Sequence, residues 1–166
     1  MGKNERTTVM RMQRIIAVLL LLAGCSNESS PTGTNGPVPT IQVYKSKTSA
    51  IPGRRAEIVS RQSRWVEVWD EITANVSPKP AIPVVDFDNV ILIFAAGGEL
   101  SDSCGDIRIE SVTRTDGALA VSILEERRPT CVCPAIVIRP VHVVSVPRAA
   151  TNATFEFRVA NVSGCQ

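Results

Sequence analysis

The sequence has a single histidine, few aromatic side chains and no long apolar run. Aromatic residues make up 4% of the chain, and the longest apolar run, from Ile15 to Gly24, covers ten residues. A membrane-spanning helix needs about 20, so no span is predicted. Any Ser-His-Asp or Cys-His mechanism would have to use His142, and no serine lies in a G-x-S-x-G elbow. A strand histidine with satisfied hydrogen bonds is therefore favoured over a catalytic one.

A strong excess of either charge is also missing. The whole chain has a net charge of +2, from 18 basic and 16 acidic residues. Residues 1–25 hold four of the basic residues and one of the acidic residues, which leaves 14 against 15 in the remainder. The remainder has no surplus of Lys and Arg from which a nucleic-acid footprint could form. We predict no nucleic-acid partner.

The N-terminal segment has the organisation of a secretory leader. Basic residues precede the apolar run, which ends in Ala23, Gly24 and Cys25. Leu22-Ala23-Gly24-Cys25 resembles the lipobox of bacterial lipoproteins, and this resemblance implies a signal peptide over residues 1–25 and an acylated Cys25, with palmitate among its fatty chains. Two or three chains, at ~0.8 kcal/mol per buried CH₂, form a lasting anchor in a lipid bilayer. In similar enterobacterial lipoproteins an Asp after the cysteine favours the inner membrane, so Ser26 points to the outer membrane of the cell envelope in an organism that has one.

Residues 26–40 and 41–166 differ in composition. The first stretch, SNESSPTGTNGPVPT, contains Val38 as its only large apolar residue. It cannot bury enough apolar surface to offset its ordering entropy, so a disordered tether is predicted. Residues 41–166 are long enough for one domain with a real core. Val and Ile dominate its apolar residues, as in a pleated sheet.

Four further cysteines predict two disulfides, because an exported chain meets an oxidising compartment. Cys131 and Cys133 lie two residues apart, where a mutual bridge would be strained. Either Cys104 pairs with Cys131 and Cys133 with Cys165, or the two partners are exchanged. The alternative is a zinc site of Cys104, Cys131, Cys133 and His142, but its spacing is not a common zinc pattern. We expect no metal and no other cofactor.

One amphipathic helix is predicted near the start of the domain. Trp65, Val68, Trp69 and Ile72 follow the i, i+3, i+4, i+7 spacing of one helical face, and Ser60 stands where an N-cap would lie. Core packing of the two tryptophans is favoured over an exposed platform for a sugar or a peptide.

The rest of the domain is predicted to be strand. Ile41 to Thr48 forms a first strand and Val90 to Ala95 a central one. Alternating runs on each side of Asp116-Gly117 predict a hairpin. An apolar stretch from Ile136 to Val146 contains Pro140, which favours an edge or a bulge, and Phe155 to Val162 forms the last strand. We predict a β-dominated α+β domain, an antiparallel sheet or sandwich with one helix.

Two other motifs are weak. Asp86 and Asp88 could hold calcium or act as an acid and a base, but Asp side chains that bond local backbone N–H groups in a turn are favoured. Gly97-Gly98 is followed by neither a helix nor a lysine, so it does not predict a phosphate loop.

In order along the chain, several motifs resemble the C-terminal domain of the PrcB family, over about residues 56–148. They are the Trp65 to Trp69 helix, Val85-Asp86-Phe87 before the apolar strand and Gly97-Gly98, Ile107-x-Ile109-x-x-Val112, Gly117-x-Leu119-x-Val121, and Pro140-x-His142-Val143-Val144-x-Val146-Pro147. The resemblance implies a non-catalytic lipoprotein subunit that supports a surface protease complex. It brings no catalytic residues.

The sequence thus predicts a membrane-anchored lipoprotein that is not an enzyme. Its domain would bind or assemble with a protein partner, and a secreted or surface protease is the candidate that the resemblance supplies. The alternative is an envelope module that binds an extended peptide or a glycan, through an edge strand or an exposed Trp65.

Overall fold

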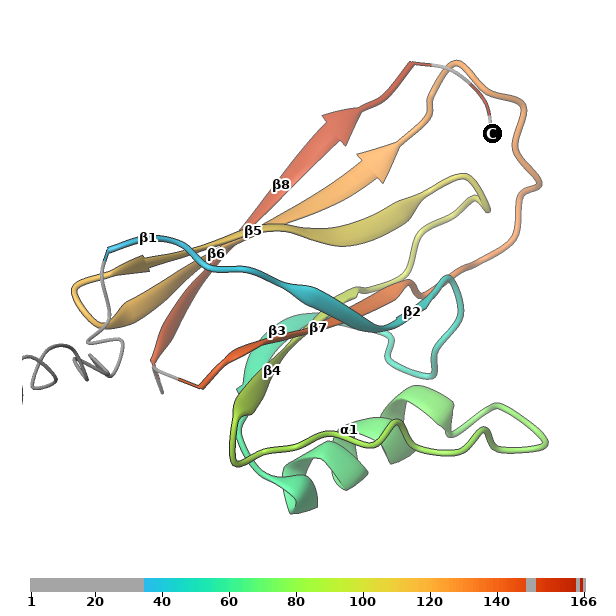
Figure 1. Cartoon of the computed structure of the whole chain (residues 1–166). Coiled ribbons are helices and arrows are strands. Elements are labelled where there is room, and N and C mark those ends of the chain that lie inside the picture. Colours follow the sequence, from blue (N-terminus) through green and yellow to red (C-terminus); the bar gives the residue numbers. More distant parts are fainter. Residues whose placement is uncertain (1–34, 149–151, 164, 166) are drawn as a thin grey trace, which may run out of the picture. The chain divides into compact units, whose positions relative to one another are not determined.

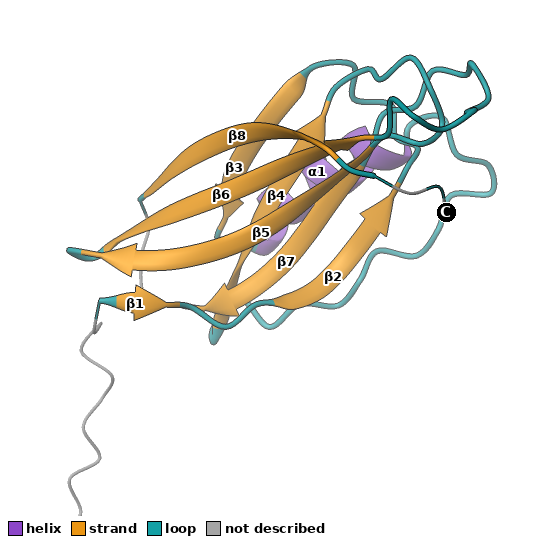
Figure 2. Cartoon of the chain, turned by 90° about the horizontal axis from the view of Figure 1, so that it is seen from above, coloured by secondary structure: helices purple, strands orange, loops and turns teal. Residues whose placement is uncertain are grey.

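The computed structural model describes residues 35–148, 152–163 and 165. Within them lie two four-stranded sheets and one helix (Figures 1 and 2). The outer sheet has the order β1-β5-β6-β8, and the helix-side sheet has the order β2-β7-β4-β3. This is the predicted β-dominated α+β class, with a β-sandwich and a single helix. No helix of the described residues is long and apolar enough to cross a membrane.

The element bounds follow the chain order. They are β1 Gly36–Pro37, β2 Ile41–Ser46, β3 Arg54–Val59, α1 Gln62–Thr73, β4 Val90–Gly97, β5 Asp106–Thr115, β6 Ala118–Arg127, β7 Val141–Pro147 and β8 Ala153–Asn161.

Two separate apolar cores hold three layers together. One core lies between α1 and the helix-side sheet and contains Trp65, Trp69 and Phe94. The other lies between the two sheets and is built from Ile, Val and Leu side chains of β4 to β7. Strand β4 serves both cores because its two faces are buried, with Leu92, Phe94 and Ala96 on one and Ile91, Ile93 and Ala95 on the other. The prediction of a central apolar strand is therefore confirmed.

The predicted helical face and the predicted hairpin are also confirmed. Trp65, Val68, Trp69 and Ile72 are all buried. The indole N–H groups of Trp65 and Trp69 donate to the carbonyls of Pro83 and Pro80, at 3.0 and 3.2 Å. The helix thus holds the proline-rich segment that follows it, and neither tryptophan is an exposed platform.

The β5–β6 hairpin turns at Asp116 and Gly117. Both residues have positive φ, at 50° and 80°, as a two-residue turn of type I′ requires. The Asn35 side chain accepts from the Asp116 backbone N–H at 2.8 Å, so the start of the described chain is bound to the hairpin tip.

The domain begins earlier than residue 41, the boundary that the composition suggested. Gly36 and Pro37 pair with Arg114 and Thr113, and the Val38 N–H donates to the carbonyl of Val112 at 2.8 Å. Val38, the one large apolar residue of the expected tether, packs against the core between the sheets. Residues 35–40 therefore belong to the fold.

Other local expectations were wrong where long-range contacts dominate. Ser60 does not cap the helix, which begins at Gln62 with Arg61 as its N-cap. Strand β3 was not predicted. Pro140 marks neither an edge nor a bulge, because it precedes β7, which lies between β2 and β4 inside its sheet. The sheets are not wholly antiparallel either, since β8 runs parallel to β6.

Glu125 is a charged residue inside the domain, although the residues that follow it, from 126 to 129, are partly or fully exposed. Its side chain is fully buried. It pairs with Arg127 at 2.6 Å and with Arg54, which comes from the other sheet. The Arg54 guanidinium also lies over the Phe157 ring. Two cations and their hydrogen bonds offset the desolvation of one carboxylate, and they join the two sheets.

Candidate functional site

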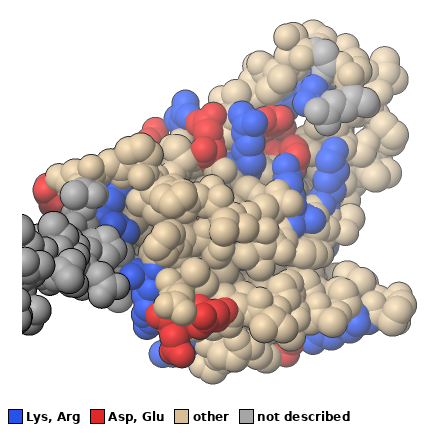
Figure 3. All heavy atoms as spheres, in the orientation of Figure 1, with Lys and Arg blue, Asp and Glu red and all other residues tan. Residues whose placement is uncertain are grey.

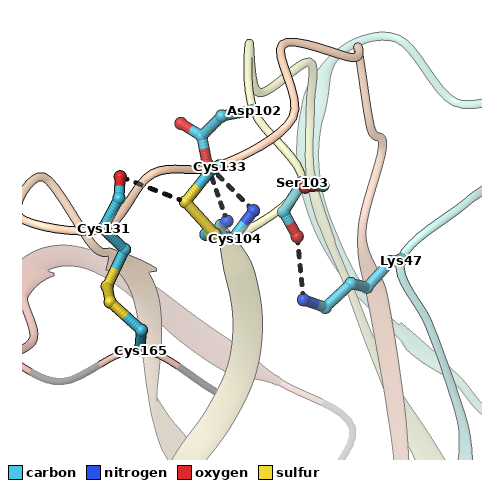
Figure 4. Close-up of a disulfide and its surroundings, with 8 residues drawn as sticks. Lys47, Asp102, Ser103, Cys104, Cys131, Cys133 and Cys165 are labelled. Atoms are coloured by element: carbon cyan, nitrogen blue, oxygen red, sulfur yellow. Dashed lines mark hydrogen bonds between the residues drawn. A yellow bond between two sulfur atoms is a disulfide. The ribbon is translucent and has the colours of Figure 1, made fainter.

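Three loops at one end of the sandwich are joined by disulfide bonds. The loop after β4, the long segment between β6 and β7, and the chain after β8 meet there (Figures 1 and 4). Cys104 is bonded to Cys133, and Cys131 to Cys165, with Cα atoms 5.7 and 5.5 Å apart. The structure thus has the second of the two pairings that the sequence left open.

These disulfides overturn the zinc alternative. Asp102, Cys104 and Cys133 lie close enough together to suggest a metal site, but both sulfurs are joined to each other. The Asp102 carboxylate instead accepts from the backbone N–H groups of Cys104 and Gly105, each at 3.0 Å. No thiolate is left in this group to bind a metal.

Backbone pairing makes the long segment a fixed part of the domain. Leu100 and Ile138 exchange two hydrogen bonds, of 2.9 and 3.0 Å, and the Ser103 N–H donates to the Pro134 carbonyl. Arg139 contacts the Glu99 carboxylate through Nε and a terminal nitrogen, at 3.0 and 2.5 Å. The segment 128–140 is therefore bonded to the loop after β4 at several points, although it forms no regular strand.

The same segment presents apolar side chains to water. Val132 is fully exposed, and Ile136 and Val137 are more than half exposed. We call these three residues the apolar loop cluster. Singly scattered exposed apolar residues are ordinary, whereas contiguous exposed apolar patches mark interaction sites.

A hollow that includes the side chains of Lys47 and Arg128 adjoins Val132 of this cluster, and Arg128 is paired with Glu126 at 3.7 Å. The hollow has a volume of about 200 Å³ and is lined by Lys47, Ser103, Cys104, Arg128, Val132 and Pro134. The Lys47 ammonium donates to the Ser103 carbonyl at 2.9 Å (Figure 4) and has no carboxylate partner among the described residues. Figure 3 shows basic and acidic side chains next to one another across the upper part of this face of the molecule. The Lys47 charge favours an acidic neighbour.

His142 lies in β7, and both of its ring nitrogens have partners. Nδ1 accepts from the Ile109 backbone N–H at 2.8 Å, and Nε2 lies 3.3 Å from the Gln42 Oε1. Burial, and then the nearby Lys45 charge, lower the pKa of His142 to about 4, while Asp106 acts in the opposite direction. A neutral imidazole with occupied nitrogens matches the strand histidine that the sequence favoured.

Asp86 and Asp88 form a turn, as expected. Asp86 accepts from the Asp88 backbone N–H at 3.1 Å and from the Asn89 side-chain amide at 2.7 Å. These bonds, the Asn89 bond first, lower the pKa of Asp86. Its carboxylate thus satisfies local donors.

Cys25, the residue expected to be acylated, lies outside the described residues, as do Ser26 and the expected leader. Sequence reasoning found all four disulfide cysteines but did not single out the apolar loop cluster. The signal was present, as Val132 between two cysteines and Ile136-Val137 after Pro134. Ile136 and Val137 were assigned to a strand, and Val132 was not considered.

The fold and this site define a small, disulfide-bonded β-sandwich domain with one helix. Searches of family models, of curated proteins and of solved structures find no match to the chain.

Proposed function

We propose that the chain is a bacterial lipoprotein, anchored through an acylated Cys25, whose domain is a non-catalytic binding or assembly module of the cell envelope. The observation that carries the binding role is the apolar loop cluster. Val132, Ile136 and Val137 are exposed on a loop that two disulfides hold, so a molecule that covered them would remove apolar surface from water.

The proposed partner is a protein surface with apolar and acidic groups. Apolar groups would cover the cluster, and carboxylates would face Lys47 in the adjoining hollow. The resemblance to the PrcB domain makes a secreted or surface protease the candidate partner. It also supports a non-catalytic role, which agrees with a histidine whose ring nitrogens are both occupied.

The test is crosslinking in intact cells, followed by capture of the chain and identification of what it carries. A variant with Val132→Ser, Ile136→Ser and Val137→Ser should lose the crosslinked protein. Val84→Ser is the matched control, because Val84 is also fully exposed but lies in the proline-rich segment beside α1. Both variants should unfold within about 0.5 kcal/mol of the wild type.

The expected result is capture of a protease or of its complex by the wild type and by Val84→Ser, but not by the triple variant. Equal capture by all three would remove the loop cluster from the proposal. Turnover of a substrate by the purified chain would overturn the non-catalytic assignment.

The second candidate is a module for extended peptides. Its platform version is excluded because Trp65 is buried. Its edge-strand version rests on β8, whose outer side has no strand partner among the described residues. Hydrogen exchange separates the two candidates, since an added peptide strand would slow exchange of β8 amides and leave segment 128–140 unchanged.

A further inference from the structure

Three of the four sheet edges carry features that prevent strand addition. Strand β1 has two residues, and one of them is Pro37. Strand β2 has a register shift between Gln42 and Tyr44 and carries Lys45. Strand β3 points Arg54 inward, towards Glu125. Short length, proline, bulges, lysine and inward charges are the devices by which proteins block edge-to-edge pairing.

Strand β8 has none of these devices, and its two charged side chains, Glu156 and Arg158, lie on the exposed face away from the core. It runs for nine residues from Ala153 to Asn161 without a proline or a lysine, and its register with β6 is unbroken. Its inward side chains are apolar and incompletely buried: Phe155 and Phe157 are intermediate, and Val159 is 51% exposed. Such an edge is a template for another strand.

The hydrogen bonds to β6 show which backbone groups of β8 are free. The Asn152 carbonyl accepts from the Leu119 N–H, and the Val162 N–H donates to the Arg127 carbonyl. The backbone N–H and C=O groups of the even-numbered residues of β8 therefore point towards β6. Because backbone groups alternate along a strand, those of Phe155, Phe157 and Val159 point to the open side.

We infer that the occupant of this edge is β8 of a second copy of the chain, antiparallel and centred on Phe157. In that register Phe157 pairs with its own counterpart and Phe155 with Val159. These are the residues with free N–H and C=O groups, so each pair exchanges two hydrogen bonds. The two outer sheets become one continuous sheet across a twofold axis, which makes the interface isologous.

The charges of β8 match the same register. Glu156 of each copy stands directly opposite Arg158 of the other, on the face away from the core. Glu156 has no ion-pair partner among the described residues, whereas Arg158 contacts Glu110 and the Ser122 hydroxyl. Opposite charges directly across an antiparallel pair are favourable, and like charges are unfavourable. A parallel pairing, or a register two residues away, would lose this match.

The test is co-purification of two differently tagged full-length chains that are expressed together and extracted in mild detergent. Wild type should capture wild type. Glu156→Arg should not capture itself, because the introduced guanidinium would face Arg158 of the other copy. Arg158→Glu should not capture itself either, because carboxylates would then face each other. Each homotypic capture should fall roughly tenfold.

Mixing the two variants is the decisive arm. Glu156→Arg with Arg158→Glu again places opposite charges across the pair, so capture should return to near the wild-type level, which also shows that both variants fold. Asp70→Arg on α1 is the matched control, with the same change of charge at an exposed site, and it should capture itself normally.

Two results would overturn the inference. One is failure of the wild type to capture itself, and the other is equal capture in every arm. If the wild type stays single while an extended peptide slows hydrogen exchange of the β8 amides, the edge serves a different strand. None of these arms depends on the apolar loop cluster or on its partner.

Discussion

His142 connects the two sheets through a single hydrogen bond. It belongs to β7 of the helix-side sheet, yet its Nδ1 accepts the Ile109 N–H of β5, in the outer sheet. The Ile109 amide lies where the short β1 no longer pairs with β5. An unpaired buried amide costs about 1–3 kcal/mol, so the imidazole replaces a missing strand partner. This role needs the neutral ring, because a protonated ring has no acceptor.

We therefore expect stability to fall with acid over a defined range. The pKa of His142 is lowered from 6.5 to about 4 in the folded state, so between these values the unfolded chain binds a proton that the folded chain does not. The contribution of His142 to the free energy of unfolding is fully present above the unfolded-state pKa of 6.5. It is lost as the pH falls towards 4, by up to about 3 kcal/mol. Urea unfolding at about pH 7.5 and about pH 4.5 measures this loss.

His142→Asn is the control for that measurement. An Asn oxygen can take the place of Nδ1 as an acceptor but does not titrate. The variant should lose less stability between the two pH values than the wild type, since only the carboxylates common to both chains still respond. An equal loss in both proteins would show that His142 is not the group responsible.

At the scale of elements, the two disulfides determine how the loop segment is held. Each closes a loop of similar length, with separations of 29 and 34 residues. Removing either bond by a pair of Cys→Ala changes, at 104 and 133 or at 131 and 165, should cost about 3 kcal/mol of unfolding free energy. The remaining pair should stay bonded, so a thiol assay on the denatured chain should detect no free thiol among the domain cysteines that remain.

A mismatched double variant distinguishes this pairing from the other. Changing Cys104 and Cys131 to Ala removes one partner from each bond, so it should lose the stabilisation of both and expose two thiols. If this variant were the more stable one and had no free thiol, the pairing in the structure would be wrong.

The elements that the sequence predicts well are those whose signal is local. The face of α1 repeats with the helical period, β4 is apolar on both sides, and Asp116-Gly117 demands positive φ. By contrast, β3 was missed because the alternation of polar and apolar residues in it is short. Arg54 is polar on the face of Ala56 and Ile58, and Val59 is apolar on the face of Arg55 and Glu57. Arg55 and Glu57 pair with Glu71 and Arg64 of α1. Its identity as a strand depends on β4 beside it.

The candidate site was predictable only in part, for a related reason. The count of four cysteines predicts two disulfides, and the short separation of Cys131 from Cys133 argues against a bond between them. Which of these two pairs with Cys165 depends on where the chain after β8 ends. That end is set by the parallel pairing of β8 with β6, which places Asn161 beside Arg127. No short-range pattern encodes this pairing. The burial of Glu125 is likewise not encoded by its neighbours in sequence, because its partner Arg54 lies in the other sheet.

At the scale of the whole molecule, the proposed anchor and the proposed binding surfaces rest on separate parts of the chain: the anchor on the leader and Cys25, the surfaces on the domain. The proposed contacts at the apolar loop cluster and at the β8 edge would form at lower bulk concentrations of the partner if the chain is tethered to a membrane. Tethering raises the effective concentration of partners. The leader supplies that tether only if Cys25 is acylated. Two or three acyl chains, at ~0.8 kcal/mol per buried CH₂, would make the anchor lasting, whereas the thiol alone would not hold the chain.

Cys25→Ser therefore tests the anchor without touching the domain. In a bacterial host fed labelled palmitate, the wild type should carry the label and partition into the detergent phase, and Cys25→Ser should carry none. Ser26→Asp is the matched variant, which should keep the label but move from the outer to the inner membrane of an enterobacterial host. Label on Cys25→Ser would refute acylation at this residue. Because residues 35–148 form their contacts without Cys25, the released domain should unfold at the same urea concentration as the anchored one.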